Sequence, residues 1–385
     1  MLLLVAFQEI RCPKKLKHKL VNLFLQLYTR RRDFSHSVAA FKQLETIDFR
    51  NIVIYSTTAL GDFLMNTPAI HEVRKRFPDA RITVVSGNKM APYIRTGIGK
   101  DWDDVVCWNS KVNTVLKLVR DLKAHGTPDL VLIMHSHNPY DYLSAVMTGA
   151  PFVFRCNHPT NPYMERWLTN STRFAHRHSV QVRLDLITPL GCRFTEKSVE
   201  MRVPCEVTKV PSPVRRVGFQ MGASSEERRW TVENFVTLAR TLLTRYRDLN
   251  IVLVGAPNEI HLSDEFLSLL EPEFHSRIEP LIGKTTVEEL TQTVNNLDLL
   301  VTNDTGTMHL AFALKVPSVS MHVSTCPQFT GPYQDYELHE IISGFASKLL
   351  LEEGEHEMAS ISADTVIEAT VKSLSARGIL PVSEE

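Results

Sequence analysis

Apolar and polar positions follow one another in regular blocks along most of this chain. Short apolar runs predict buried strands, and segments with apolar residues three and four positions apart predict amphipathic helices. In the first half, this pattern predicts strands at 51–56, 81–86 and 129–134 and helices at about 60–77 and 115–122. In the second half, it predicts strands at 216–220, 250–255, 299–302 and 317–322.

This alternation of strands and helices predicts parallel sheets with helices on both faces. A further helix is predicted after Thr286, since Glu289 three residues on completes a capping box. The proline-rich segment 203–213 (VPCEVTKVPSP) predicts a linker between two α/β halves. We therefore expect two Rossmann-like domains facing across a cleft. The expected boundaries are a basic extension at 1–48, an acceptor domain at 49–205, a nucleotide-sugar domain at 206–361 and a C-terminal helix and tail at 362–385.

Length and charge narrow the class of protein. A chain of 385 residues exceeds what one hydrophobic core usually supports, so two domains are expected. The 43 basic and 43 acidic side chains cancel, which removes the overall positive field that nucleic-acid binding needs. With 43% hydrophobic residues, the composition is that of an ordinary globular protein.

The cysteines and the absence of long apolar runs point to the cytoplasm. Six cysteines are scattered without a C-x-x-C pair, so neither a structural zinc site nor a disulfide framework is expected. No apolar run reaches the roughly 20 residues of a membrane-spanning helix. The apolar start at 1–7 lacks the flanking features of a signal peptide.

The first fifty residues are unusually basic, with ten Lys and Arg against four Asp and Glu. Within them, apolar residues recur at helical spacing: Leu20, Leu23, Phe24, Leu27 and Tyr28. A basic amphipathic helix of this kind can lie on an anionic membrane surface. It can equally pack its apolar stripe on the protein's own core, and the pattern leaves both interpretations open.

Polar turns follow three of the predicted strands, where open parallel sheets bind their ligands. The first turn, 57–62, ends in Gly61 and Asp62 at the start of a helix. A carboxylate at a helix N-terminus suits a structural role there or a general base facing a ligand. From spacing alone, the structural role is favoured.

The second turn, 220–224, is followed by Arg228, Arg229 and Trp230. Two neighbouring guanidinium groups beside a small-residue turn can donate to phosphate oxygens. The alternative is a solvated charged segment next to a packed tryptophan. Sequence alone does not separate the two.

The third turn, 303–309, places small and hydroxyl residues at the start of an apolar helix. Its free backbone N–H groups predict a pyrophosphate site, to which His309 could donate. The alternative is a simple N-cap by Asp304 with a buried histidine. His135 and His137 end another strand, but without a third ligand they predict substrate hydrogen bonds rather than a metal site.

Together these turns resemble glycosyltransferase family 9, the bacterial heptosyltransferases, over about residues 51–333. The matching segments are 59–62 (ALGD), 66–69 (NTPA), 77–80 (FPDA), 222–224 (GAS), 229–230 (RW), 283–285 (GKT), 303–306 (NDTG) with His309, and 330–333 (TGPY). The segments are short, but their order and separation make the match specific.

The resemblance implies a GT-B fold that needs neither cofactor nor metal. It makes Asp62 the catalytic base and Arg228 the residue that neutralises the leaving diphosphate. The remaining donor site implied by the family comprises Gly222, Ser224, Arg229, Glu259 at the ribose, Thr285 at the adenine, Asp304, Thr305, Gly306, Thr307 and His309. The expected acceptor site comprises Thr58, Gly61, His135 and His137.

The activity that the resemblance implies is inverting transfer of heptose from ADP-heptose to a lipopolysaccharide inner-core acceptor. The expected partners are thus a nucleotide sugar, a lipid-linked saccharide and, through residues 1–48, an anionic membrane surface. Alternatives are another nucleotide sugar on the same fold, a sugar-nucleotide epimerase, or a non-catalytic descendant that binds sugar nucleotides or scaffolds an envelope complex. A two-domain periplasmic binding protein fits poorly, since no export signal is seen.

Overall fold

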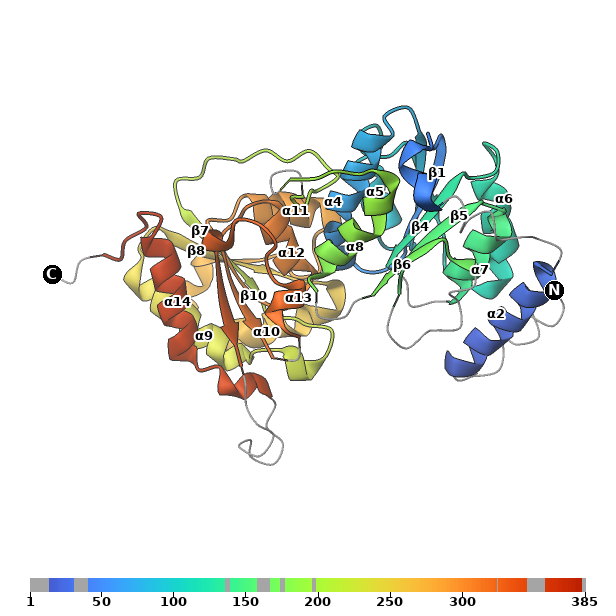
Figure 1. Ribbon diagram of the computed structural model, residues 1–385. Helices are drawn as coiled ribbons and strands as arrows, with labels where there is room; N and C mark the ends of the chain where they lie inside the picture. Colours follow the sequence, from blue (N-terminus) through green and yellow to red (C-terminus); the bar gives the residue numbers. More distant parts are fainter. Residues whose placement is uncertain are drawn as a thin grey trace. The chain divides into compact units, whose positions relative to one another are not determined.

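The computed structural model describes residues 14–30, 41–135, 139–157, 167–173, 177–195, 199–323, 325–344 and 357–382. The chain forms two compact units that divide between Cys205 and Glu206 (Figure 1). Each unit contains one six-stranded parallel sheet with helices on both faces. The expected α/β fold with Rossmann-like sheets is therefore confirmed.

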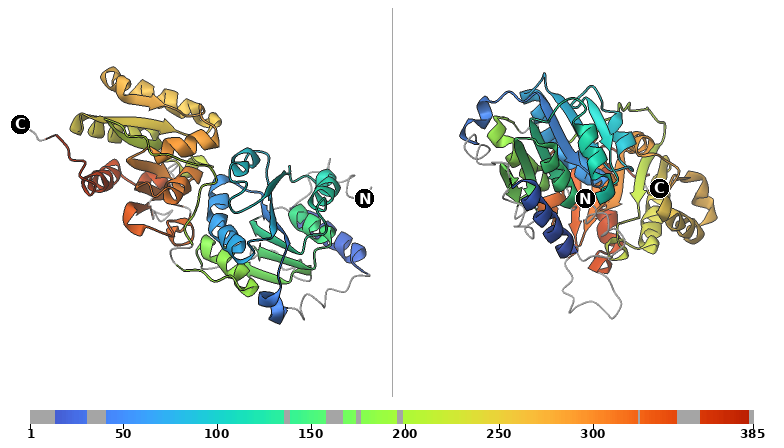
Figure 2. Two further views of the ribbon diagram at one scale, coloured as in Figure 1. Left: turned by 90° about the horizontal axis from the view of Figure 1, so that it is seen from above. Right: turned by 90° about the vertical axis from the view of Figure 1, so that its right-hand side faces the viewer.

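The first unit has the strand order β3-β2-β1-β4-β5-β6. Its strands are β1 (Asn51–Ser56), β2 (Arg81–Ser86), β3 (Asp104–Cys107), β4 (Leu130–His135), β5 (Phe152–Asn157) and β6 (Asn170–Arg173). Its helices are α2 (Lys14–Tyr28), α4 (Leu60–Arg76), α5 (Ala91–Arg95), α6 (Val115–Leu122), α7 (Pro139–Thr148) and α8 (Ser179–Ile187). Helices α4 and α8 pair on one face of the sheet, and α6 and α7 pair on the other (Figures 1 and 2).

The second unit repeats this order, as β12-β11-β10-β7-β8-β9. Its strands are β7 (Arg215–Gln220), β8 (Leu249–Val254), β9 (Ile278–Pro280), β10 (Leu299–Asn303), β11 (Ser318–His322) and β12 (His339–Ser343). Its helices are α9 (Val232–Arg245), α10 (Ile260–Leu269), α11 (Val287–Asn295), α12 (Gly306–Ala313), α13 (Pro327–Thr330) and α14 (Ala363–Ser375). Helices α9, α10 and α14 share one hydrophobic core with β7, β8 and β10.

The predicted elements agree with the structure to within a residue or two. Helix 115–122 and strands 51–56 and 81–86 have the predicted bounds, and α11 begins with the predicted capping box. The pattern of apolar positions did not predict five strands: β3, β5, β6, β9 and β12. Four of them are sheet edges, where one side of the strand is less buried and the apolar run is short. In the inner strand β5, Arg155 interrupts the run yet is buried, its guanidinium 5.5 Å from the Tyr142 ring centroid.

Helix α2 has two apolar faces. On one face, Val21 and Leu25 are fully buried in the core that α6 and α7 form with the sheet. On the other, Leu16, Leu23 and Leu27 lie one above another at helical spacing and are 43%, 54% and 60% exposed. One interpretation of the amphipathic pattern, packing on the protein's own core, therefore holds for one side of the helix. Among the described residues, no helix is long and apolar enough to cross a bilayer.

Truncating the buried face of α2 should weaken the first unit. Leu25→Ala removes a fully buried side chain and should lower the free energy of unfolding by about 2–4 kcal/mol. Leu27→Ala, the same substitution on the exposed face, should change it by less than about 0.5 kcal/mol. Urea unfolding followed by circular dichroism measures both. Equal losses in the two variants would contradict the assignment of the buried face.

Candidate active site

The carboxyl end of the first sheet brings together residues from the turn after β1 and the end of β4. The strand order reverses between these two strands, which is where open parallel sheets leave a crevice for ligands. A shift in register at the end of the pair places Ser56 beside His135. The ring nitrogen Nδ1 of His135 lies 3.0 Å from the Thr58 hydroxyl. Two of the predicted acceptor residues are thus in hydrogen-bond contact, while His137 lies outside the described residues.

Asp62 lies in the first turn of α4, directly after the buried Gly61. Its carboxylate is about one quarter exposed, and Oδ2 lies 3.4 Å from Nδ1 of His135. The partial positive charge of the helix N-terminus attracts the negative charge of the carboxylate. The geometry therefore offers an accessible carboxylate beside a histidine at the ligand-binding edge of the sheet.

Arg183 contacts the Asp62 carboxylate from the buried side. The sequence analysis did not predict this residue as part of the site. The side chain is 1% exposed, and its NH2 group lies 3.6 Å from Oδ1 of Asp62. Its Nε donates to the Asn66 side chain, and its NH1 donates to the Ser179 carbonyl at 2.6 Å. Burial lowers the pKa of Arg183, while neighbouring Cys156 and Asp62 favour its charged form. A helical pattern assigns a single arginine in an apolar helix to the solvent side, so only the fold reveals its position.

The second unit has the same reversal of strand order between β7 and β10. Asn303, at the end of β10, ties the two loops together. Its side-chain amide donates to the Met221 carbonyl at 2.7 Å, and its oxygen accepts from the Trp230 backbone N–H at 3.1 Å. The predicted turns 220–224 and 303–309 therefore meet at one edge of the sheet.

Glu259 is buried at this edge, and its carboxylate lies so close to two neighbouring loop positions that only glycine fits there. Its carboxylate accepts from the Ala256 backbone N–H at 2.8 Å and from the Gln220 side-chain amide at 3.3 Å. A Cβ atom built on Gly222 would lie 2.0 Å from the Glu259 carboxylate, and one on Gly255 would lie 2.7 Å from it. Only a residue without a side chain leaves this carboxylate in place.

Arg228 is held over the β7 and β10 loops by an ion pair with Asp304. Its guanidinium also donates to the Asp304 carbonyl and to the Ser224 hydroxyl, both at 3.0 Å. The Asp304 carboxylate, 9% exposed, additionally accepts from the Thr325 hydroxyl. Asp304 thus holds the Arg228 cation in place. Because the Asp304 carboxylate and carbonyl are already hydrogen-bonded, Asp304 could contact an anion only through its backbone N–H.

A second potential cation near Asp304 is neutral near pH 7. His322 is buried at the end of β11, with Nδ1 3.9 Å from Oδ2 of Asp304. Burial lowers the pKa of His322, the Arg228 charge acts in the same direction, and Asp304 opposes them. Arg228 therefore supplies the positive charge beside Asp304.

The other predicted donor residues surround this edge. Thr305 and Gly306 begin α12, which lacks a side-chain cap, so the first backbone N–H groups of that helix are open to an anion. Thr307 donates to the Gln220 side chain at 3.2 Å, and His309 is buried one turn into the helix. Arg229 approaches the Ala223 carbonyl at 3.4 Å.

Thr285 lies in the loop after β9, which is tied to the loop after β8. The Gly283 N–H donates to the Gly255 carbonyl at 3.0 Å, and Gly283 has the positive φ of 72° that favours glycine. This brings Thr285 toward the turn that carries Glu259. Among the described residues, no three His, Cys, Asp or Glu side chains gather closely enough to hold a metal ion.

Comparison with known proteins agrees with this arrangement. Residues 184–344, which begin within α8 just after Arg183 and include the loops at the carboxyl edge of the second sheet, match the family model described as Glycosyltransferase family 9 (heptosyltransferase). The similarity to glycosyltransferase family 9 therefore covers the carboxyl edge of the second sheet. The chain is a glycosyltransferase, and its fold is GT-B.

Three individual relatives match this chain over most of their own length. A lipooligosaccharide heptosyltransferase 2 of Campylobacter jejuni is 25% identical over 294 residues, 74% of this chain and 84% of the relative. The structure of the family 9 glycosyl transferase from Veillonella parvula matches with a TM-score of 0.71 and 24% identity, covering 86% of this chain and 98% of that one. The E. coli heptosyltransferase WaaC with ADP-2-deoxy-2-fluoro heptose matches with a TM-score of 0.62 and 16% identity, covering 83% and 99%.

The buried Glu259 carboxylate gives a direct test of the geometry at the carboxyl edge of the second sheet. Gly222→Ala places a methyl group on the Glu259 carboxylate and should lower the free energy of unfolding by about 1–3 kcal/mol. The matched control is Gly87→Ala, where the nearest atom is the Thr57 carbonyl oxygen at 3.4 Å, an ordinary contact. Urea unfolding of both variants makes the comparison. If Gly222→Ala were as stable as Gly87→Ala, the Glu259 carboxylate would not occupy the position described.

Proposed function

We propose that this glycosyltransferase moves a heptose from ADP-heptose to a lipopolysaccharide inner-core acceptor, either lipid A–Kdo or heptose, with inversion and without a metal. The observation that carries the proposal is that each unit presents reactive groups at the carboxyl edge of its own sheet: an accessible carboxylate in the first unit, and a fixed cation with an open helix N-terminus in the second. The heptosyltransferase description of the family, and the ADP-heptose analogue bound to WaaC, support the choice of donor.

In the proposed reaction, the first unit holds the acceptor and Asp62 acts as the base. Asp62 takes the proton from an acceptor hydroxyl while that oxygen bonds to the anomeric carbon of the donor. The bond from the anomeric carbon to the diphosphate oxygen breaks, and its electron pair leaves with ADP. His135 lies 3.4 Å from the same carboxylate and would orient the acceptor beside it.

Arg183 would keep Asp62 in place during this step. Because Arg183 is held by Asn66 and by the Ser179 carbonyl, its charge cannot turn away from the carboxylate. Asn66 in turn donates to the Ser56 hydroxyl at 2.8 Å, which connects this support to the end of β1. We therefore assign Arg183 and Asn66 as positioning residues for the base.

The loops after β7 and β10, at the carboxyl edge of the second sheet, would stabilise the leaving ADP. Negative charge grows on the diphosphate as its bond to the sugar breaks, and fixed donors stabilise that charge more strongly in the transition state than before it. Arg228 and the backbone N–H groups at the start of α12 are such donors. They supply the positive charge that a metal ion would otherwise provide. Glu259 would accept from the ribose hydroxyls, and Thr285 would contact the adenine.

The exposed face of α2 supports location at the inner face of a membrane. Leu16, Leu23 and Leu27 form an apolar row on the side of the helix opposite the protein core. Lys17 and Lys19 on the same helix, and Arg30 just after it, complement anionic headgroups. We therefore propose that this cytoplasmic enzyme binds peripherally where a lipid-linked acceptor would be presented.

Removal of the base tests the reaction. Asp62→Asn should lower kcat for ADP release from ADP-heptose and a delipidated core acceptor by about 10²- to 10⁴-fold, because no group then takes the proton. ADP affinity should be unchanged. Asp79→Asn, at a carboxylate that is 77% exposed, is the matched control and should retain activity. Near-normal turnover in Asp62→Asn would refute the assignment of the base.

Nucleotide binding tests the donor. Calorimetric titration in EDTA should give binding of ADP in preference to UDP, GDP and CDP. Preference for UDP or GDP would keep the fold and the site but replace the donor with another nucleotide sugar. If none of the four nucleotides binds, a non-catalytic descendant that scaffolds an envelope complex would be favoured instead.

Membrane association tests the role of α2. The wild-type chain should sediment with phosphatidylglycerol vesicles, and Leu23→Asp/Leu27→Asp should abolish this because two charges then replace the apolar row. Leu380→Asp, at a leucine near the C-terminus that is 68% exposed, is the control. Sedimentation that survives the double substitution would rule out this face as the membrane contact.

A further inference from the structure

The turn after β1 is held by a carboxylate that the proposed reaction does not use. The Thr57 hydroxyl donates to Oδ2 of Asp141 at 2.7 Å. Asp141 is fully buried and lies in the first turn of α7, the helix that follows β4. The hydrogen bond therefore joins the turn after β1 to the start of α7. Strands β1 and β4 are the central pair of the sheet, and the crevice for the proposed acceptor opens where their connections separate.

The residue next to Thr57 leads from this hydrogen bond to the proposed base. The Thr58 hydroxyl lies 3.0 Å from Nδ1 of His135, and the same nitrogen lies 3.4 Å from Oδ2 of Asp62. Because one planar peptide bond joins Thr57 to Thr58, fixing Thr57 also restricts the position of Thr58. Asp141 is thus connected to the proposed base through Thr57, Thr58 and His135.

The surroundings of Asp141 make it a rigid support. The partial positive charge at the start of α7 favours a carboxylate there. The Asp141 backbone carbonyl accepts from the Ser144 hydroxyl at 2.8 Å. Arg155 lies close enough for its charge to act on Asp141, since burial lowers the pKa of Arg155 while Tyr142 and Asp141 oppose that shift. A hydroxyl also bonds more strongly to a carboxylate than to a neutral acceptor, so the Thr57 contact is well suited to hold a turn.

The second unit contains a comparable connection at its own strand reversal. There, the buried side chain of Asn303 donates to the Met221 carbonyl and accepts from the Trp230 backbone N–H. This joins the loops after the two central strands β10 and β7. In each unit, therefore, one buried polar side chain connects the segments that follow the central strands.

We propose that Asp141 is a positioning residue that sets the separation of the turn after β1 from the start of α7, and so places the acceptor hydroxyl against Asp62. Asp141 is fully buried, so it acts through Thr57 and does not touch the acceptor itself. This inference rests on the proposed function, because it assigns the crevice of the first unit to the acceptor. The competing explanation is that Asp141 only stabilises the start of α7.

Steady-state kinetics with ADP-heptose and a delipidated core acceptor test the inference. Thr57→Val removes the hydroxyl and keeps the branched shape, and it should raise KM for the acceptor about tenfold because the acceptor hydroxyl is then misplaced. KM for ADP-heptose should not change. Thr57→Ser retains the hydroxyl and should restore the wild-type acceptor KM. A purely structural role would lower the amount of folded enzyme, and hence kcat, with both KM values unchanged.

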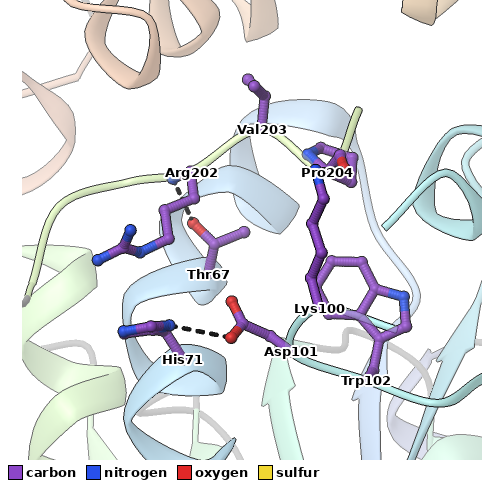
Figure 3. Close-up of a pocket in the computed structure, with 8 residues that line it drawn as sticks. All are labelled: Thr67, His71, Lys100, Asp101, Trp102, Arg202, Val203 and Pro204. Atoms are coloured by element: carbon purple, nitrogen blue, oxygen red, sulfur yellow. Dashed lines mark hydrogen bonds and ion pairs between the residues drawn. The ribbon is translucent and has the colours of Figure 1, made fainter. Parts of the chain in front are cut away.

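Asp141→Asn is the second variant, and its effect should not add to that of Thr57→Val, because both substitutions disrupt the same hydrogen bond. The matched control is Asp101→Asn. The Asp101 carboxylate is 16% exposed and lies 2.9 Å from Nδ1 of His71, beside a cavity of the first unit (Figure 3). Asp101 precedes β3, so it belongs to the amino edge of that strand, away from the acceptor crevice. Its substitution should leave the acceptor KM unchanged.

The wild-type chain separates the two possible failures. If it transfers sugar to the core acceptor from none of the nucleotide sugars, the proposed function fails and this inference fails with it. If wild type is active, with ADP-heptose or with another donor, three results would overturn the inference alone. These are an unchanged acceptor KM in Thr57→Val, an equal rise in Asp101→Asn, and additive effects of Thr57→Val and Asp141→Asn. Loss of folding in both single variants would establish the structural role instead.

Discussion

The reversal of strand order at the centre of each sheet is the constraint on which the chemistry of this enzyme depends. The helices that follow the two central strands leave toward opposite faces, so the loops between them separate at the carboxyl edge. Polar groups can be brought together there without entering the hydrophobic core. The first unit uses this position for Asp62 and His135, and the second for Arg228 and the start of α12.

Buried charges give both sites their rigidity. A charge removed from water must be paired or hydrogen-bonded, because an unpaired charge in a core is strongly destabilising. Arg183 meets this requirement through Asn66, Ser179 and Asp62, and Glu259 meets it through Ala256 and Gln220. These charged groups have little freedom to move, so the groups they contact are also held. Pre-organised groups of this kind stabilise a transition state without having to reorganise during the reaction.

The N-terminal helix shows that one amphipathic pattern can serve two surfaces. Its apolar residues cover more of the helix than one interface requires, and the structure divides them between the core and the exposed row. The sequence alone left core packing and membrane contact as alternatives. Tertiary structure shows that packing of Val21 and Leu25 leaves a second apolar face available.

Local patterns were sufficient to predict the central strands and the helices that follow them. They also predicted the turns that carry Asp62, Arg228 and Asp304. This is possible because the burial of a strand and the start of a helix depend on residues that are close in sequence. Short edge strands such as β6 (NSTR) lack such a pattern. Contacts between distant segments could not be predicted at all. Arg183 lies 121 residues from Asp62, and Asp304 lies 76 residues from Arg228. Such contacts depend on which loops the strand order brings to the same edge, and that order is a property of the whole sheet.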